Sequence, residues 1–382
     1  IEAESQDTAL RIFSTLNDRG LPLSDADIFK AQFYKYYGDK GQKNEFIEEW
    51  KNLEDITSKI FHPNTGTPMD ELFTRYMYFL RAREGNKSTT VESLRKFFER
   101  NKYQYLKNDI AIKELKTLAL FWENVIRQNK DIFTENILKK LFVLNYAPNG
   151  MWQYITSVYF LTNNNDGLLA EQAFIDFLDK IIAFIFAHAI INPGVNALRT
   201  PIFEEMINII NGVSVTFTSR KFSQQQARTS FENYIFTNNR PVTRSILTWY
   251  AFTFKNQQLL DISESFQIEH IFAKKRQELE NSLDKETNLE SLGNKVLLEE
   301  SINIKASDYR FDDKKIIYSG EARRGSNKLP SKVAEISHLI LSSDFNERDI
   351  IDRNKMILDK FFEFLKIQNL LIQTINDVTI NI

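Results

Sequence analysis

The sequence predicts a mainly α-helical protein with one small element of two strands and a helix in its last third. Glycine and proline are scarce, at 12 and 8 of 382 residues, which disfavours the many turns of an all-β protein. Apolar residues recur at spacings of three and four along most of the chain, which is the period of an amphipathic helix. Two short runs, near residues 266 and 295, are instead typical of strands.

Consecutive helices are predicted over the first two thirds of the chain. Ser24 is expected to cap one of them, with Asp27 three residues later completing a capping box. The apolar run Ile181–Ile191 predicts a buried core helix, because its 11 residues fall short of the about 20 that cross a bilayer. One short strand is expected at Val213–Phe217, where β-branched residues are frequent.

The last third of the chain changes pattern. The run Phe266–Glu269 alternates like a short strand, and Lys295–Leu298 is a second apolar run of strand length. A helix is expected from Glu300 onward. The segment Glu347–Ile367 has the periodicity of a long amphipathic helix that closes the fold.

Composition excludes several classes of site. Cysteine is absent, so disulfides, thiolate metal sites and cysteine nucleophiles are excluded, and a reducing cytoplasm fits this usage. The net charge is only -2, so a nucleic-acid partner would need a local basic patch. The chain opens on Ile1 within a helical pattern, from which we expect it to be part of a longer protein.

One histidine stands out among the four in the chain. His188 lies in the apolar run, His62 in a polar loop and His338 on a helical pattern. His270 instead follows Glu269 at the end of a predicted strand. Two asparagines come next, first Asn294 before the second strand and then Asn303, nine residues later in the following helix.

These residue types suit the hydrolysis of a phosphodiester. A neutral histidine such as His270 can take a proton from water near neutral pH. Glu269 and the amide oxygen of Asn303 are hard ligands of the kind that Mg²⁺ prefers. Asn294 is expected to orient the imidazole, by holding either the loop or the ring nitrogen. The spacing alone leaves open that these short motifs occur together by chance.

At these residues the chain resembles the C-terminal HNH (His-Me finger) domain of GmrSD-type restriction endonucleases. The similar segments are Phe266–Phe272, Ser291–Leu298 and Asn303–Tyr318, the last with Phe311, Lys314, Lys315 and Tyr318 in the spacing of the family. Ala273 stands where the family has proline. The lack of cysteine excludes the zinc-containing variant of the HNH domain.

A second resemblance lies near the start of the chain. Leu16–Gly20, with Asp25, Asp27 and Lys30, is similar to the last motif of the N-terminal domain of the same family, which resembles ParB-like nucleotide hydrolases. The two resemblances together imply three parts. These are a C-terminal remnant of the ParB-like domain at 1–40, a helical domain at 41–212 and an HNH nuclease domain with a closing helix at 213–382. Use of a nucleoside triphosphate would then depend on the region that precedes this chain.

The resemblance implies a metal-dependent DNA endonuclease of a prokaryotic, cytoplasmic phage-defence system that restricts modified or foreign DNA. Mg²⁺ or Mn²⁺ would be its cofactor, held by Glu269 and Asn303, with His270 and Asn294 as the catalytic residues. No membrane is expected as a partner, whereas a second copy of the chain or the missing N-terminal domain fits the architecture. Two alternatives stay open: a helical regulatory module with a decayed HNH fold, and a nuclease that acts on RNA.

Basic residues near the site predict where DNA would bind. Between 303 and 332 the chain has eight Lys and Arg against four Asp and Glu, a local excess in a chain of net charge -2. Phosphate contacts of this kind supply affinity rather than sequence preference. A solvated loop would have the same composition, so each assignment is a hypothesis. The residues expected to bind DNA are Lys274, Lys275, Lys305, Arg310, Lys314 and Lys315.

Overall fold

The structure, a computed structural model, describes residues 23–321 and 329–372. The chain divides into two compact units, and both are mainly helical, as the sequence predicts. The first unit contains the described residues of Ile1–Ile132, Gln153–Leu169 and Ile202–Ser214, and the second contains those of Phe133–Trp152, Ala170–Pro201 and Val215–Ile382. Residues 16–20, on which the N-terminal resemblance depends, lie outside the described residues.

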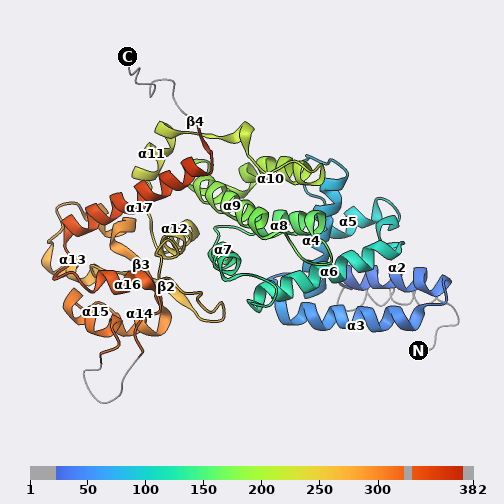
Figure 1. The fold of residues 1–382 in the computed structure, drawn as a ribbon, viewed down its shortest axis with the longest axis horizontal. Helices are drawn as coiled ribbons and strands as arrows, with labels where there is room; N and C mark the ends of the chain where they lie inside the picture. The colour runs from blue at the N-terminus through green and yellow to red at the C-terminus, as the bar shows by residue number, and fades with distance from the viewer. Residues whose placement is uncertain (1–22, 322–328, 373–382) are drawn as a thin grey trace. The chain divides into compact units, whose positions relative to one another are not determined.

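Helices of the first unit follow one another with short connections (Figure 1). The capping box predicted at Ser24 is confirmed, because its hydroxyl accepts from the backbone N–H of Asp27 at 3.1 Å and the Asp27 carboxylate accepts from the N–H of Ser24. The elements are α2 (Asp25–Asp39), α3 (Lys43–Ile60), α4 (Pro68–Arg83), α5 (Leu94–Glu99), η1 (Gln104–Leu106) and α6 (Asp109–Ile126), with parts of α8 (Met151–Asn163) and α10 (Val195–Ile210).

Aromatic side chains form the core of the first unit. The ring of Phe29 lies 4.9 Å from that of Phe73 and 4.7 Å from that of Phe98, measured between centroids. Trp50 adds a further contact with Phe73 at 6.0 Å. Such pairs contribute about 0.5–1.5 kcal/mol beyond the burial of their area, so the high phenylalanine content serves packing here.

The second unit combines long helices with short elements. Its helices before the predicted site are α7 (Glu135–Asn145), α9 (Glu171–Ile191), η2 (Thr218–Arg220), α11 (Gln224–Glu232) and α12 (Pro241–Ala251). The site region contains β2 (Phe266–His270), α13 (Lys274–Glu280), η3 (Glu286–Glu290), η4 (Leu292–Asn294), β3 (Lys295–Glu299), α14 (Glu300–Ala306) and α15 (Phe311–Tyr318). The unit ends with α16 (Ala334–Leu339), α17 (Glu347–Ile367) and the two-residue strand β4 (Leu371–Ile372), which pairs in parallel with β1 (Phe222–Ser223).

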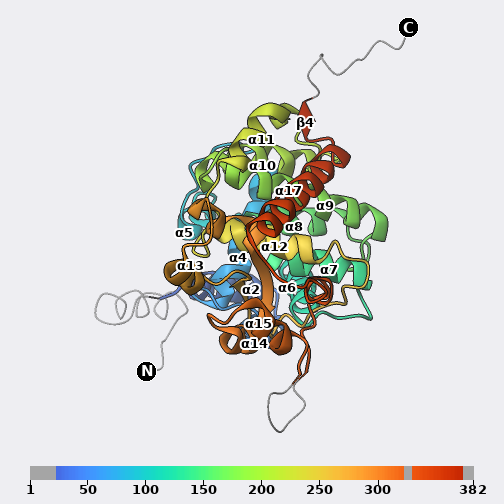
Figure 2. The ribbon, with the colours of Figure 1, turned by 90° about the vertical axis from the view of Figure 1, so that its left-hand side faces the viewer.

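β2 and β3 are the two predicted strands, and they pair with each other as a two-stranded sheet, here called the hairpin; α14 follows β3 directly. The strands pair antiparallel, with Glu269 opposite Val296 and His270 opposite Lys295. In Figures 1 and 2, α12 lies on one side of this hairpin, and α14 and α15 lie on the other. Both faces are therefore covered, which agrees with the burial of every residue of β3.

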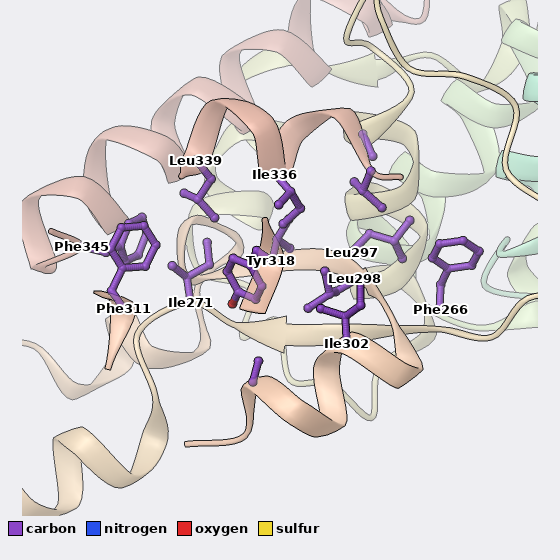
Figure 3. Close-up of a cluster of buried hydrophobic side chains, with 14 of the residues drawn as sticks. Phe266, Ile271, Leu297, Leu298, Ile302, Phe311, Tyr318, Ile336, Leu339 and Phe345 are labelled. Carbon is purple, nitrogen blue, oxygen red and sulfur yellow. The ribbon is translucent and has the colours of Figure 1, made fainter. Parts of the chain in front are cut away.

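A cluster of buried hydrophobic side chains surrounds the hairpin. Figure 3 shows side chains from the strands meeting those of α14, α15 and α16. Because protein interiors are close-packed, these side chains restrict movement of the strands and so of the polar residues at the strand ends. The labelled members are Phe266, Ile271, Leu297, Leu298, Ile302, Phe311, Tyr318, Ile336, Leu339 and Phe345.

The strand expected at Val213–Phe217 is wrong, because residues 213–217 are irregular. Phe217 has a left-handed backbone with φ of 50°, which a strand does not allow. Its ring stacks on Phe184 of α9 with centroids 3.6 Å apart. Burial of one large aromatic ring has therefore overridden the local preference of β-branched residues.

The apolar run Ile181–Ile191 forms the second half of α9 and is largely buried, as predicted. His188 lies within it as a core histidine, and burial lowers its pKa to about 4. Across residues 23–321 and 329–372, no helix has the length and apolar character needed to span a bilayer.

Candidate functional site

Glu269 and His270 are the last two residues of β2, and alternation sends their side chains to opposite faces of the strand. Glu269 contacts α15, which continues from α14 on one side of the hairpin. His270 contacts Lys295, its partner across the hairpin. The candidate site therefore has two faces, here called the acid face and the imidazole face.

On the acid face, the Glu269 carboxylate is buried between two residues of α15. Its Oε1 accepts a hydrogen bond from the Tyr318 hydroxyl at 2.8 Å and lies 2.7 Å from the Lys314 ammonium. Lys314 also donates to the backbone carbonyl of His270 at 2.6 Å. Burial raises the pKa of the Glu269 carboxyl above its ordinary value, although Lys314 and Tyr318 oppose this.

Asn303 of α14 lies on the same face of β2. Its Nδ2 donates to Gln267 Oε1 at 2.7 Å, and Gln267 is two residues before Glu269 on the strand. The other end of the amide, Asn303 Oδ1, is buried and has no hydrogen-bond partner among the described residues. A buried oxygen without a donor costs about 1–3 kcal/mol, so this atom is chemically suited to a cation.

On the imidazole face, His270 Nε2 lies 2.8 Å from the Lys295 ammonium and 3.7 Å from Glu290 Oε1. Because an ammonium only donates, the facing ring nitrogen must be the acceptor, which places the ring proton on Nδ1. Burial lowers the pKa of His270 to about 3, and the adjacent Lys295 adds to the shift. The ring is therefore neutral near pH 7, the state that a proton acceptor requires.

Lys295 is buried beneath the imidazole with a side-chain exposure of 0%. Its three N–H groups face His270, the Glu290 carboxylate at 2.7 Å and the Asn238 amide oxygen. Burial lowers the pKa of Lys295 to about 8, against the opposing effect of Glu290. Burial alone would raise the pKa of Glu290, but the hydrogen bonds from Lys274 and Lys295 outweigh this effect and hold the pKa below its ordinary value.

Asn294 connects the end of β2 to the start of β3. Its side chain accepts from the Phe272 N–H at 2.7 Å and donates to the carbonyls of Phe272 and Leu289 at 3.1 Å each. Its backbone carbonyl accepts from the N–H of Ile271 at 2.9 Å. Asn294 therefore holds the backbone that follows His270. The sequence left open whether it holds the loop or the ring nitrogen, and these contacts are with the loop.

The Leu292–Asn294 turn is in turn fixed by α17. A Cβ built on Gly293 would lie 1.9 Å from the carbonyl oxygen of Ile350, so only glycine permits this close approach. Arg353 donates from Nη1 to the carbonyls of Leu292 and Gly293 at 2.9 and 2.8 Å. The closing helix thus anchors the position of Asn294.

Most of the basic residues predicted to bind DNA lie at the surface, as a phosphate contact requires. Those with exposed or partly exposed side chains are Lys274, Lys275, Lys305, Arg310 and Lys315. Lys274 is the one that reaches the imidazole face, where it pairs with Glu290 at 2.5 Å. Lys314 differs from the sequence-based expectation, because its ammonium is buried against Glu269 and faces the interior of the site.

Sequence reasoning missed Lys295, Glu290 and Asn238. The signal for Lys295 was the pairing register, since the residue opposite His270 in an antiparallel hairpin shares its face. Glu290 ends the short helix η3 and Asn238 lies in a turn, and no periodic pattern in the sequence predicts that either reaches the site. Within the described part of the chain, no three or more His, Asp or Glu side chains gather as a metal-binding group.

Comparison with known proteins concerns the second unit. Residues 220–360 match the family model described as GmrSD restriction endonucleases, C-terminal domain. The matched segment contains Glu269, His270, Asn294 and Asn303. No curated protein matches the chain.

Proposed function

Residues 220–360 belong to the C-terminal domain family of GmrSD restriction endonucleases, and from this premise we propose that the chain is a metal-dependent DNA endonuclease with a single HNH site. One observation carries the proposal. At the end of β2 a neutral, partly buried imidazole and a buried carboxylate leave opposite faces of the strand, with lysine and amide groups around them.

His270 is proposed as the general base. Its Nε2 lone pair accepts from Lys295, so the same lone pair can take a proton from water once Lys295 turns to another acceptor. Asn294 holds the backbone on the C-terminal side of His270 and so fixes the direction of the ring. A well-placed general base typically contributes about 10²–10⁴ to a rate.

The acid face is proposed to hold Mg²⁺ or Mn²⁺ through Glu269 and Asn303. The donor set fits, because a carboxylate and a buried amide oxygen without a donor are hard oxygen ligands. A divalent cation there would offset the negative charge that develops on the phosphate during hydrolysis. Lys314 already places one positive charge against Glu269, so it would share the carboxylate or turn away.

The proposed substrate is duplex DNA that carries a modification or comes from outside the cell, cut in the cytoplasm of a prokaryote as a defence against phage. Exposed lysine and arginine side chains around the hairpin supply the phosphate contacts that this requires. The division at 1–40, 41–212 and 213–382 is kept as part of the proposal, with the nuclease in the last part.

One contact favours a second function. The ion pair between Lys314 and Glu269 is almost fully buried, which also suits a purely structural role for the carboxylate. In that case the domain would bind nucleic acid without cutting it and would act as a regulatory module.

The test is nicking of supercoiled plasmid by the purified chain, with Mg²⁺, with Mn²⁺ and with EDTA. We expect nicking with either metal and none with EDTA. Plasmid from modifying and non-modifying hosts, and an RNA duplex, are incubated in parallel to define the substrate. Binding to DNA without cleavage under every metal condition would contradict the nuclease and favour the regulatory module, whereas cleavage of RNA alone would overturn the choice of substrate.

A further inference from the structure

The Glu290 carboxylate lies among three basic side chains on the imidazole face. Its Oε1 is 2.5 Å from the Lys274 ammonium and 3.7 Å from His270 Nε2. Its Oε2 is 2.7 Å from the Lys295 ammonium. Each carboxylate oxygen therefore has its own lysine, and the anion lies directly beside the proposed base.

This arrangement matches the chemistry of a phosphodiester. The diester carries one negative charge over two non-bridging oxygens, as a carboxylate does, and lysine ammonium groups bind both anions. We propose that the position of the Glu290 carboxylate is the binding site for a phosphate of the DNA backbone beside His270, and that Glu290 is a built-in competitor that leaves when the DNA backbone enters. The inference rests on the proposed nuclease function and assigns its phosphate site and its self-inhibition.

Burial within the cluster shows the direction from which a phosphate would enter. The Lys295 side chain has an exposure of 0%, that of Glu290 is 19% and that of Lys274 is 50%. Lys295 thus forms the floor of the site, and Lys274 lies at its solvent edge. A phosphate arriving past Lys274 would meet first the exposed lysine, then the buried one and the imidazole.

The Glu290 side chain can turn while its backbone stays in place, provided that a phosphate replaces it against Lys295. Its backbone carbonyl accepts from the N–H of Phe236 at 3.2 Å, so the chain is held at this point independently of the side chain. The carboxylate itself contacts only side chains in the described part of the molecule. Rotation of Glu290 toward solvent would release Lys274 and Lys295 for another anion.

A purely structural ion pair makes a different prediction. If Glu290 serves only to neutralise buried Lys295, Glu290→Gln should lower stability and leave anion binding unchanged. If it competes with phosphate, the same change should strengthen anion binding, because it removes the carboxylate that occupies Lys274 and Lys295. We expect a dissociation constant lower by about tenfold.

The first experiment titrates the full chain with dimethyl phosphate, a phosphodiester anion, and follows the ring nitrogen signals of its four histidines by NMR. The His270 signals should shift at about tenfold lower concentration in Glu290→Gln than in the parent. Glu278→Gln is the matched control. Glu278 is an exposed carboxylate paired with Lys275, so its substitution removes the same charge outside the site. Lys295→Met in the Glu290→Gln background should abolish the shift of His270.

The second experiment measures the affinity of the same variants for a short DNA duplex in EDTA, where no cleavage is expected. Glu290→Gln and Glu290→Ala should both bind more tightly than Glu278→Gln. If Glu290→Gln folds poorly, Glu290→Ala provides the same comparison in a separate variant, and a thermal melt accompanies each.

The outcomes separate this inference from the function beneath it. Tighter binding in Glu290→Gln together with no nicking by the parent would support the phosphate site and overturn the nuclease. A parent that nicks plasmid, with Glu290 variants that bind no better than Glu278→Gln, would overturn the phosphate site and leave the nuclease intact. A His270 shift that persists in Lys295→Met would also overturn it.

Discussion

The acid face and the imidazole face of β2 each pair a candidate catalytic residue with a lysine, but their surroundings differ. On the acid face, the side chains of Lys314 and Glu269 are 1% and 7% exposed, and Tyr318 completes the carboxylate contacts. On the imidazole face, Lys295 is buried, but its partner Glu290 reaches solvent beside Lys274. The acid face is therefore organised to retain its partners, and the imidazole face to exchange them.

The five-residue strand β2 therefore has one face that mainly affects the stability of the fold and one that mainly affects catalysis. A closed pair contributes to folding mainly because loss of one partner leaves a buried charge, whereas an open pair can change partners at small cost. Substitutions on the two faces should then differ in whether they lower the melting temperature or the cleavage rate.

The largest effect is expected on the imidazole face. His270→Ala should slow plasmid nicking by about 10²–10⁴, because His270 is the one imidazole that contacts Lys295 among the described residues. Its melting temperature should stay close to that of the parent. His338→Ala, which changes an exposed histidine of α16, is the matched control and should nick normally. A normal rate in His270→Ala would place the base elsewhere.

Substitution on the acid face should act on folding as well as on activity. Glu269→Ala leaves the buried Lys314 ammonium unpaired and should lower the free energy of unfolding by about 3–5 kcal/mol. The double variant Glu269→Ala/Lys314→Met removes both charges and should recover most of that loss in a denaturant titration. Equal stability of the single and double variants would show that an unpaired Lys314 does not destabilise the fold.

Asn294 holds the backbone that follows His270 and contacts neither Glu269 nor the imidazole, so its loss should be intermediate. Asn294→Ala removes hydrogen bonds to Phe272, just after β2, and to Leu289 of η3, and should cost about 2–4 kcal/mol in chemical denaturation. It should also slow cleavage, because the backbone after His270 loses its anchor. A variant as stable as the parent would show that Asn294 does not hold this part of the backbone.

The stability of the fold should depend on pH through His270 of the imidazole face. The pKa of His270 is lowered to about 3, below its ordinary value of 6.5, so the unfolded state binds more protons between these limits. Stability contributed by this residue is therefore present above pH 6.5 and declines as the pH falls toward 3. Between pH 6.5 and 4.5, the parent should lose more stability than His270→Gln, measured by thermal melts. Parallel curves would contradict the burial of the ring.

The smallest effects concern the surface lysines. Lys274→Ala should weaken DNA binding and flatten its salt dependence by about one phosphate contact, a change near 0.9 in the logarithmic slope. Lys275→Ala changes a lysine that pairs with Glu278 outside the imidazole face, and its effect should be smaller. Equal losses in the two variants would mean that the two lysines serve only as general positive charge.

Patterns that depend on local periodicity could be predicted from the sequence. The closing helix was expected at Glu347–Ile367 and has these bounds, because its apolar stripe repeats over five turns. The two strands Phe266–Glu269 and Lys295–Leu298 are predicted to within one residue of the observed ends, and the capping box at Ser24 is present. In each case neighbouring residues determine the outcome.

Features that depend on distant contacts could not be predicted. The run Val213–Phe217 has strand composition, yet stacking of Phe217 on Phe184 decides its conformation. Lys314 was expected at the DNA surface, because the composition of a segment does not reveal which lysine faces inward. Glu290 ends the short helix η3, and only the folded structure brings it to Lys274 and Lys295.

A titration with Mn²⁺ tests the separation of the two faces most directly. Plasmid nicking by Glu269→Gln and His270→Ala is measured over a wide range of Mn²⁺ concentrations, with the parent and His338→Ala beside them. Loss of a metal ligand weakens cation affinity, whereas loss of the base does not. Glu269→Gln should regain part of its activity at high Mn²⁺, and His270→Ala should stay inactive throughout. Recovery of His270→Ala by metal, or the same flat response in both variants, would contradict a division of labour across β2.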